Sequence, residues 1–211
     1  MSETTPARIT TEELEKIKQA PAAAGIPELL RKRWSPRAFA DREIAADDLE
    51  KLFVAASWAA SSFNEQPWRF LVGRRGDGTY KKIFDALMEF NQLWAKSAPV
   101  LVLAVGKKTF SHNSSPNKYG LHDTGAATAY LVLQATALGL HAHSMAGFDQ
   151  EKARNSFAIP ADYDIGAVTA VGYLGDPYTL PEQMRKGELA PRSRKAVAEF
   201  VFSEWETPVS F

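Results

Sequence analysis

The stretch from Asp123 to Leu138 constrains the fold more than any other part of the sequence. It is apolar nearly all round, and positions 125–127 and 129 hold glycine or alanine. A helix of this composition is buried on every side, and its small side chains let a second helix approach closely. The sequence therefore predicts a long helix at 123–138 that packs in the interior or against another helix.

Shorter periodic segments flank this helix. Residues 46–60 place apolar side chains at i, i+3, i+4 and i+7, which predicts a helix, and the apolar run 100–105 predicts a strand covered on both faces. Similar patterns predict helices at 11–19, 27–33 and 80–94, strands at 68–74, 141–145 and 165–174, and a short helix between the last two strands. Because helices and strands do not alternate rhythmically, we expect an α+β fold rather than a doubly wound sheet.

The two ends of the chain differ from its body. Residues 1–26 hold one amphipathic segment and then a run rich in proline and glycine, which predicts an N-terminal arm joined loosely to a single domain at 27–200. The tail at 201–211 carries large apolar side chains beyond the last regular element. Because such a tail is not stable in water, we expect it to pack on its own body or on a partner.

The composition excludes several classes of protein. The 25 Lys and Arg residues balance the 25 Asp and Glu residues, so the chain lacks the basic excess of a nucleic-acid binder, and it has no Cys for disulfides or thiol chemistry. No apolar run reaches the ~18–20 residues of a membrane-spanning helix. The N-terminus lacks the basic start and apolar core of a secretory signal. We therefore expect no nucleic-acid or membrane partner and a cytoplasmic location.

Two motifs are explained better by structure than by function. The turn 73–78 follows a strand and precedes a helix, but its glycines have the spacing G-x-x-G-x-G and its charged residues indicate an exposed turn, not a dinucleotide site. His141 and His143 share one face of a strand, yet no third ligand is evident, which favours ordinary packing over a metal site.

Two arginine clusters indicate a ligand. Arg33, Ser35 and Arg37 alternate along an extended stretch, which places two guanidinium groups and a hydroxyl on one face and suits a phosphate or a polyol. A second cluster, 192–195, lies near the other end of a neutral chain. Each cluster alone is typical of a solvated surface, but the two together predict convergence on one anionic group.

The same segments carry a resemblance to a known family. The run R-W-S-P-R-A-F at 33–39 is similar to the R-x-S-x-R/K-x-F signature of the nitroreductase family of FMN-dependent oxidoreductases. The run S-S-F-N-E-Q-P-W-R-F at 61–70 resembles the family motif S-S-x-N-x-Q-P-W-x-F, with seven positions in agreement at fixed spacing. Shorter stretches of agreement extend the resemblance over about residues 27–200.

The resemblance implies an α+β sheet flanked by helices, built as an intertwined homodimer with FMN at each subunit interface. It implies a ping-pong reaction in which hydride passes from NAD(P)H through flavin N5 to a small electron-poor acceptor such as a nitroaromatic, a quinone or an enal. The cofactor carries that chemistry, so no catalytic side chain is expected. The alternatives are a specialised family member (dehalogenation, semialdehyde reduction or flavin remodelling) and a flavin-binding module without catalysis.

The resemblance also implies roles for individual residues. Arg33, Ser35, Arg192 and Arg194 would hold the FMN phosphate, and Arg37 would reach the N1/O2 side of the ring, where negative charge appears on reduction. The other expected cofactor-binding residues are Trp34, Ala60, Ser61, Ser62, Asn64, Asn91, Met145, Ala146 and Gly147. Of these, the serines and Asn64 would come from the other subunit, Asn91 would bond ribityl or ring atoms, and the backbone at 146–147 would face the N5/O4 edge.

Three positions depart from the family pattern. Trp94 and Ala146 stand where some members carry Lys and Glu, and Ala60 stands where proline is common. Without the Lys and Glu found at positions 94 and 146 in those members, Arg37 alone would face the reduced ring, and the pocket would be more apolar. The polar loop at 111–120 would set access to the flavin.

Overall fold

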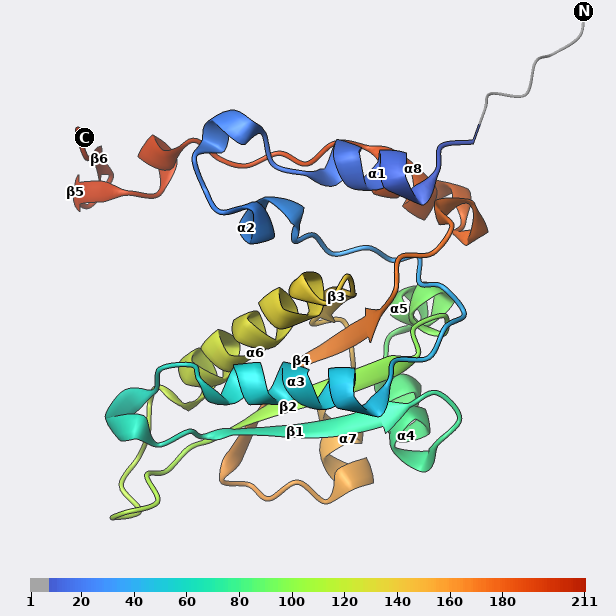
Figure 1. Ribbon diagram of the computed structural model, residues 1–211. Coiled ribbons are helices and arrows are strands. Elements are labelled where there is room, and N and C mark those ends of the chain that lie inside the picture. The colour runs from blue at the N-terminus through green and yellow to red at the C-terminus, as the bar shows by residue number, and fades with distance from the viewer. Residues whose placement is uncertain (1–7) are drawn as a thin grey trace, which may run out of the picture.

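The computed structural model describes residues 8–211, and its centre is a four-stranded sheet (Figure 1). The strands are β1 (Trp68–Arg74), β2 (Val100–Lys107), β3 (His141–Met145) and β4 (Tyr163–Gly172), in the order β1-β2-β4-β3. Every neighbouring pair is antiparallel. Helices cover both faces of the sheet, so the α+β prediction is confirmed.

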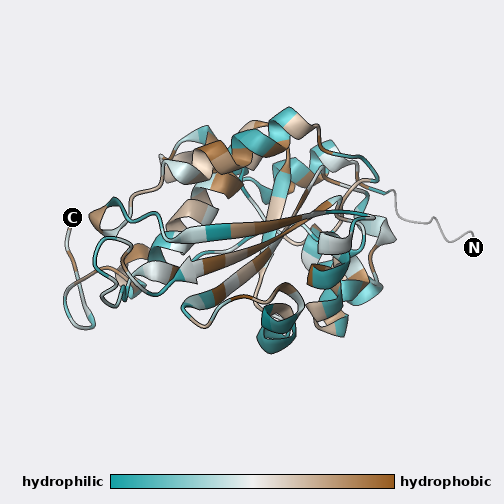
Figure 2. Cartoon of the chain, turned by 90° about the horizontal axis from the view of Figure 1, so that it is seen from below, coloured by the Kyte–Doolittle hydropathy of each residue, from teal (hydrophilic) through white to brown (hydrophobic). Residues whose placement is uncertain are grey.

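Strand β2 lies inside the sheet, and only its last residue, Lys107, is not buried. Leu101 and Leu103 belong to the apolar cluster on one face of the sheet, whereas Val100 and Val102 belong to the cluster on the other. Figure 2 accordingly shows brown, hydrophobic segments along the strands of the sheet, and teal, hydrophilic segments on the surrounding helices and loops. The prediction of a strand covered on both faces is confirmed.

The helices in the described part of the chain form two layers around the sheet. Helices α3 (Ala46–Ser57) and α6 (Gly120–Ala137) cover one face, and α4 (Gly78–Ala86), α5 (Glu89–Ala95) and α7 (Gln150–Phe157) cover the other. Helices α1 (Thr11–Lys18), α2 (Glu28–Lys32) and α8 (Glu182–Leu189) lie along the upper side in Figure 1. No helix within residues 8–211 combines the length and apolar character needed to cross a membrane.

The single helix predicted at 80–94 is wrong, because the chain leaves the helical conformation at Leu87 and Met88. Leu87 forms a β-bridge with Phe148, and the Met88 N–H donates to the Gly147 carbonyl at 3.0 Å. Because these backbone groups bond to the segment that follows β3, they are not available to a continuous helix. The result is two helices, α4 and α5, with a turn that fits against β3.

The helix predicted at 123–138 is present as α6, but it is not buried on every side within this chain. Leu131 and Ala135 face the sheet and are fully buried, whereas Tyr130 on the opposite face is 44% exposed. Gly125 and Ala129 are exposed on that face, and a Cβ at Gly125 would meet no atom within 4 Å. The small residues therefore present an open surface to solvent rather than to a helix of the same chain.

The loose attachment expected for the arm is wrong for residues 8–26, and residues 1–7 lie outside the described part. Leu14 is fully buried, and α1 lies beside α8 (Figure 1). Ala20 and Arg31 bond in both directions, from Ala20 N–H to the Arg31 carbonyl and from Arg31 Nε to the Ala20 carbonyl, each at 3.0 Å. The arm is thus part of the folded body, while a domain boundary at residue 26 stays a prediction.

The tail forms a hairpin from β5 (Phe202–Glu204) and β6 (Thr207–Pro208) that runs past α2, away from the sheet (Figure 1). Trp205 is 87% exposed and Phe211 is 95% exposed. The expectation that the tail packs on its own body is therefore wrong for these side chains. Packing on a partner subunit stays a prediction.

Candidate functional site

Three arginines from the two predicted clusters meet beside the exit of α2. Burial and the nearby charge of Arg194 lower the pKa of Arg33, and burial together with the charges of Arg33 and Arg194 lowers the pKa of Arg192. None of the ion pairs formed within residues 8–211 includes these three guanidinium groups. The two predicted clusters thus meet as a concentration of positive charge without a carboxylate partner. Their convergence on one anionic group stays a prediction.

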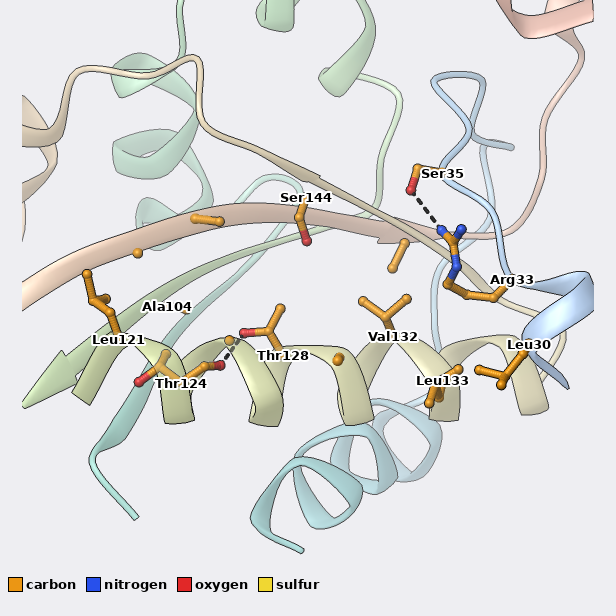
Figure 3. Close-up of a pocket in the computed structure, with 15 residues that line it drawn as sticks. Leu30, Arg33, Ser35, Ala104, Leu121, Thr124, Thr128, Val132, Leu133 and Ser144 are labelled. Atoms are coloured by element: carbon orange, nitrogen blue, oxygen red, sulfur yellow. Dashed lines mark hydrogen bonds between the residues drawn. The ribbon is translucent and has the colours of Figure 1, made fainter. Parts of the chain in front are cut away.

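The Arg192 guanidinium also bonds to the main chain of a neighbouring segment. Its guanidinium donates to the main-chain carbonyl of Arg33 at 2.6 Å and to that of Arg31 at 2.8 Å, so it binds the segment after α8 to the end of α2. Its Nε atom is buried and has no partner. Arg33 in turn donates to the Ser35 hydroxyl at 3.2 Å (Figure 3).

A cleft of about 660 Å³ begins at Arg33 and Ser35 and runs along α6 over the sheet (Figure 3). Its walls are mostly apolar or small, with Thr124, Thr128 and Val132 from α6 on one side and Ser144 from β3 on the other. A second hollow of about 470 Å³ shares Arg33 with this cleft and contains all three arginines. The charged cluster therefore stands at one end of a long, weakly polar cleft.

The segment that carries Arg37 is bound by Glu188 of α8. The Glu188 carboxylate is 2% exposed and accepts the backbone N–H of Arg37 at 2.7 Å. Burial raises the pKa of Glu188, while the N–H bonds and the charges of Arg37 and Lys18 oppose that rise. The Nε atom of Arg37 is buried without a partner. Sequence reasoning missed Glu188, because a glutamate in a short polar helix is typical of a solvated surface.

Asn91 lies between the predicted segment 145–147 and the core. Its Nδ2 donates to the Gly147 carbonyl at 2.8 Å, and its Oδ1 accepts from the indole of Trp94 at 3.2 Å. A Cβ at position 147 would lie 2.6 Å from Asn91 Nδ2, so a larger residue there would displace the Asn91 amide. Met145 is buried and Ala146 is exposed. The structure thus brings Asn91 and 145–147 together, as expected of a shared site.

Within one chain, the turn that holds Ser61, Ser62 and Asn64 lies apart from Asn91 and residues 145–147. Asn64 has a φ of 54°, in the left-handed region, and the Ser62 N–H donates to the Asp123 carboxylate at the start of α6 at 2.9 Å. Ala60, just before the turn, is exposed. Figure 1 shows the α3–β1 connection and α5 at opposite ends of the sheet. One chain therefore holds two separate parts of the predicted site.

The two histidines of β3 pack behind the arginine segment. The ring of His141 meets Trp34 edge-on, with centroids 5.6 Å apart, and Nδ1 of His143 lies 2.9 Å from the Pro36 carbonyl. Burial lowers the pKa of each histidine to about 4. Both rings are therefore neutral at pH 7, and Trp34 is placed by packing on the inner side of the segment.

The pattern described as "Nitroreductase family" matches residues 30–92 and 77–173, more than half of the chain. The chain belongs to the nitroreductase family. A protein of Archaeoglobus fulgidus with the provisional name NADH dehydrogenase/NAD(P)H nitroreductase is 30% identical over 148 residues, which cover 68% of this chain and 82% of that protein.

Two solved structures share the nitroreductase fold of this chain. One, described as an oxidoreductase containing FMN, has a TM-score of 0.81 and 34% identity, with 88% of this chain and 94% of that chain covered. A nitroreductase family protein from Clostridium difficile 630 has a TM-score of 0.65 and 27% identity, with 83% and 96% covered.

Proposed function

We propose that this chain is an FMN-dependent NAD(P)H oxidoreductase that passes hydride to a small, flat, electron-poor acceptor. The observation that carries the proposal is that Arg33, Arg192 and Arg194 line one hollow of about 470 Å³ without a carboxylate partner. Like charges gathered in this way destabilise a folded chain unless an anion joins them, and two of the three, Arg33 and Arg192, are only partly exposed. The phosphate of FMN is such an anion, and a structurally similar protein is described as containing FMN.

FMN fits the residues of the site. The buried Nε of Arg192 lacks a partner, as an atom does when its acceptor is a ligand. The adjoining cleft of about 660 Å³ is largely apolar, which suits a flat aromatic ring. Arg33, Ser35, Arg192 and Arg194 would hold the phosphate, and Arg37 would supply positive charge beside the ring.

Bound FMN would supply the chemistry of hydride transfer between a nicotinamide and a second substrate. The chain's own residues bind and orient the reactants and exclude water. Asn91 keeps one amide N–H free after its bond to Gly147, so it can donate to a ligand. His141 and His143, with pKa values of about 4, are neutral at pH 7 and so do not serve as imidazolium acids there. We infer that the proton needed by the acceptor comes from solvent.

We infer further that the working form is a homodimer. Ser62 is bound to Asp123 near the first turn of α6, whereas Arg33 shares the cleft with Leu133 near its last turn. Asp123 and Leu133 are ten residues apart, roughly 15 Å along the helix. A two-fold contact across the open face of α6 would place the start of one α6 beside the end of the other. The turn 61–64 of the partner subunit would then reach the arginines.

Reconstitution and reduction test the proposal. The purified chain mixed with FMN should retain the yellow flavin in equal molar amount after gel filtration. Stopped-flow mixing with NADH or NADPH should then bleach the flavin absorbance, and a quinone should restore it. A chain that retains no flavin contradicts the proposal, and flavin that neither nucleotide bleaches indicates a binding module without catalysis.

A further inference from the structure

The N-terminal arm precedes the part of the chain that matches the family, which begins at residue 30. It is nevertheless firmly docked, since Leu14 is fully buried and the Ile9 N–H donates to the Tyr178 hydroxyl at 3.1 Å. Helix α1 lies beside α8, and the chain leaves α8 directly toward Arg192 and Arg194 (Figure 1). The arm therefore contacts the segment that carries two of the three clustered arginines.

Lys18, the last residue of α1, makes the closest contact with α8. It is 5% exposed, and its Nζ donates to the carbonyls of Gly187, at 3.0 Å, and Ala190. The same ammonium group lies 5.1 Å from the centre of the Trp34 ring. The last carbonyls of a helix carry partial negative charge and lack partners within the helix, so a buried ammonium satisfies them. This lysine holds the end of α8 in place.

The residues after Lys18 form a wall of the charged hollow. Positions 19–21 line the hollow of about 470 Å³ together with the three arginines. Ala20 bonds in both directions with Arg31, and the Arg31 carbonyl also accepts from Arg192 at 2.8 Å. The arm thus reaches Arg192 by two routes, through the end of α8 and through Arg31.

We propose that the arm completes the phosphate end of the cofactor site, and that Lys18 is a positioning residue that places Arg192 and Arg194 by holding the end of α8. The proposal rests on the proposed function, because the anion is taken to be the FMN phosphate. Lys18 acts through the arginines and does not touch the ligand. Its loss should therefore weaken recognition of the phosphate much more than recognition of the flavin ring, which Lys18 affects only through its charge near Glu188.

Titrations with FMN and with riboflavin, which has the same ring but no phosphate, separate these two effects. In full-length Lys18→Met, whose side chain has similar length but no donor, the FMN Kd should rise roughly tenfold and the riboflavin Kd less than about twofold. Lys18→Arg should restore most of the FMN affinity. The control is Lys16→Met, since Lys16 is an exposed residue of α1 bonded to Glu12.

The outcomes distinguish the two proposals. If Lys18→Met keeps the wild-type ratio of the two Kd values, the positioning role is wrong while the proposed function stands. If the wild-type chain binds neither flavin, the proposed function itself fails.

Hydrogen exchange on the wild-type chain tests the same inference without a variant. Coupling between two sites is reciprocal, so a phosphate that depends on the arm must also stabilise the arm. Exchange in the peptide 11–25 should be roughly tenfold slower with saturating FMN than with saturating riboflavin. Equal protection by the two flavins would overturn the proposal, even if the Lys18 variants do not fold.

Discussion

Glu188 bonds to the backbone of Arg37, 151 positions earlier in the chain, through a carboxylate oxygen 2.7 Å from the Arg37 nitrogen. The same oxygen accepts the N–H of Ala38 at 3.1 Å. Both N–H groups lie in a segment that water scarcely reaches, so the carboxylate is their partner in place of water. One side chain thus sets the path of the backbone that carries Arg37.

We expect Glu188→Ala to destabilise the chain by about 2–4 kcal/mol, because two buried N–H groups lose their acceptor. Glu188→Gln retains an acceptor oxygen and should cost less. Urea unfolding measures both values. The control is Glu182→Ala on the same helix, an exposed residue paired with Lys186, for which a change within about 0.5 kcal/mol is expected. Equal losses at positions 188 and 182 would contradict the role of Glu188.

The phosphate arginines can be tested by charge removal. In Arg33→Ala combined with Arg194→Ala, the FMN Kd should rise by roughly a hundredfold or more, because charge-assisted bonds to the phosphate are lost. Without FMN the double variant should be no less stable than wild type, since the charge of Arg194 acts against that of Arg33. Fluorescence titration and thermal unfolding measure the two effects, with Lys195→Ala as control. Stoichiometric flavin in the double variant would refute the phosphate assignment.

The open face of α6 provides a test of the shared site. Because a Cβ at Gly125 meets no atom within 4 Å of its own chain, Gly125→Arg should fold. We expect it to block the subunit contact and halve the mass seen by light scattering. Because Gly125 also lines the cleft, FMN binding should be abolished both by the lost contact and by the arginine itself. Gly78→Arg, at another glycine with open space around it, is the control. A Gly125→Arg protein that remains dimeric and retains flavin would show that the site does not depend on this face.

The buried histidines predict how stability depends on pH. Burial, with the charge of Arg33 as a second cause at His141, lowers the pKa of His141 and of His143 to about 4. In the unfolded chain a histidine has a pKa of ~6.5. Between these values the unfolded chain binds protons that the folded chain does not, so stability is complete above pH ~6.5 and falls as the pH drops toward 4.

Between pH 7 and pH 4.5 the expected loss is about 2–2.5 kcal/mol per histidine. Urea unfolding at pH 7 and at pH 4.5 measures it. His143→Gln should reduce the difference between the two pH values. An unaltered difference in His143→Gln would show that the proton uptake occurs elsewhere.

Local patterns determined most of the elements and the two halves of the site. The strands 68–74 and 141–145 have their predicted bounds, because alternating or apolar runs end there at glycines or polar turns. The alternation of Arg33 and Ser35 and the second cluster at 192–194 predicted the meeting of the arginines. These features depend on the identities of neighbouring residues, which the sequence states directly.

Other features of the chain could be seen only in the tertiary structure, because they depend on contacts between segments that lie far apart in the sequence. The break at Leu87 and Met88 arises because the segment after β3 takes up their backbone groups. Lys18 and Glu188 are charged residues of short polar helices, and the docking of α1 on α8 is what buries them. Burial of a charge is favourable only where bonding partners are brought to it, and no local pattern records where those partners lie. For the same reason, the small residues of α6 predicted contact with another helix, but they did not indicate which one. The structure shows that no helix of the same chain covers this face, which leaves it open to a second subunit.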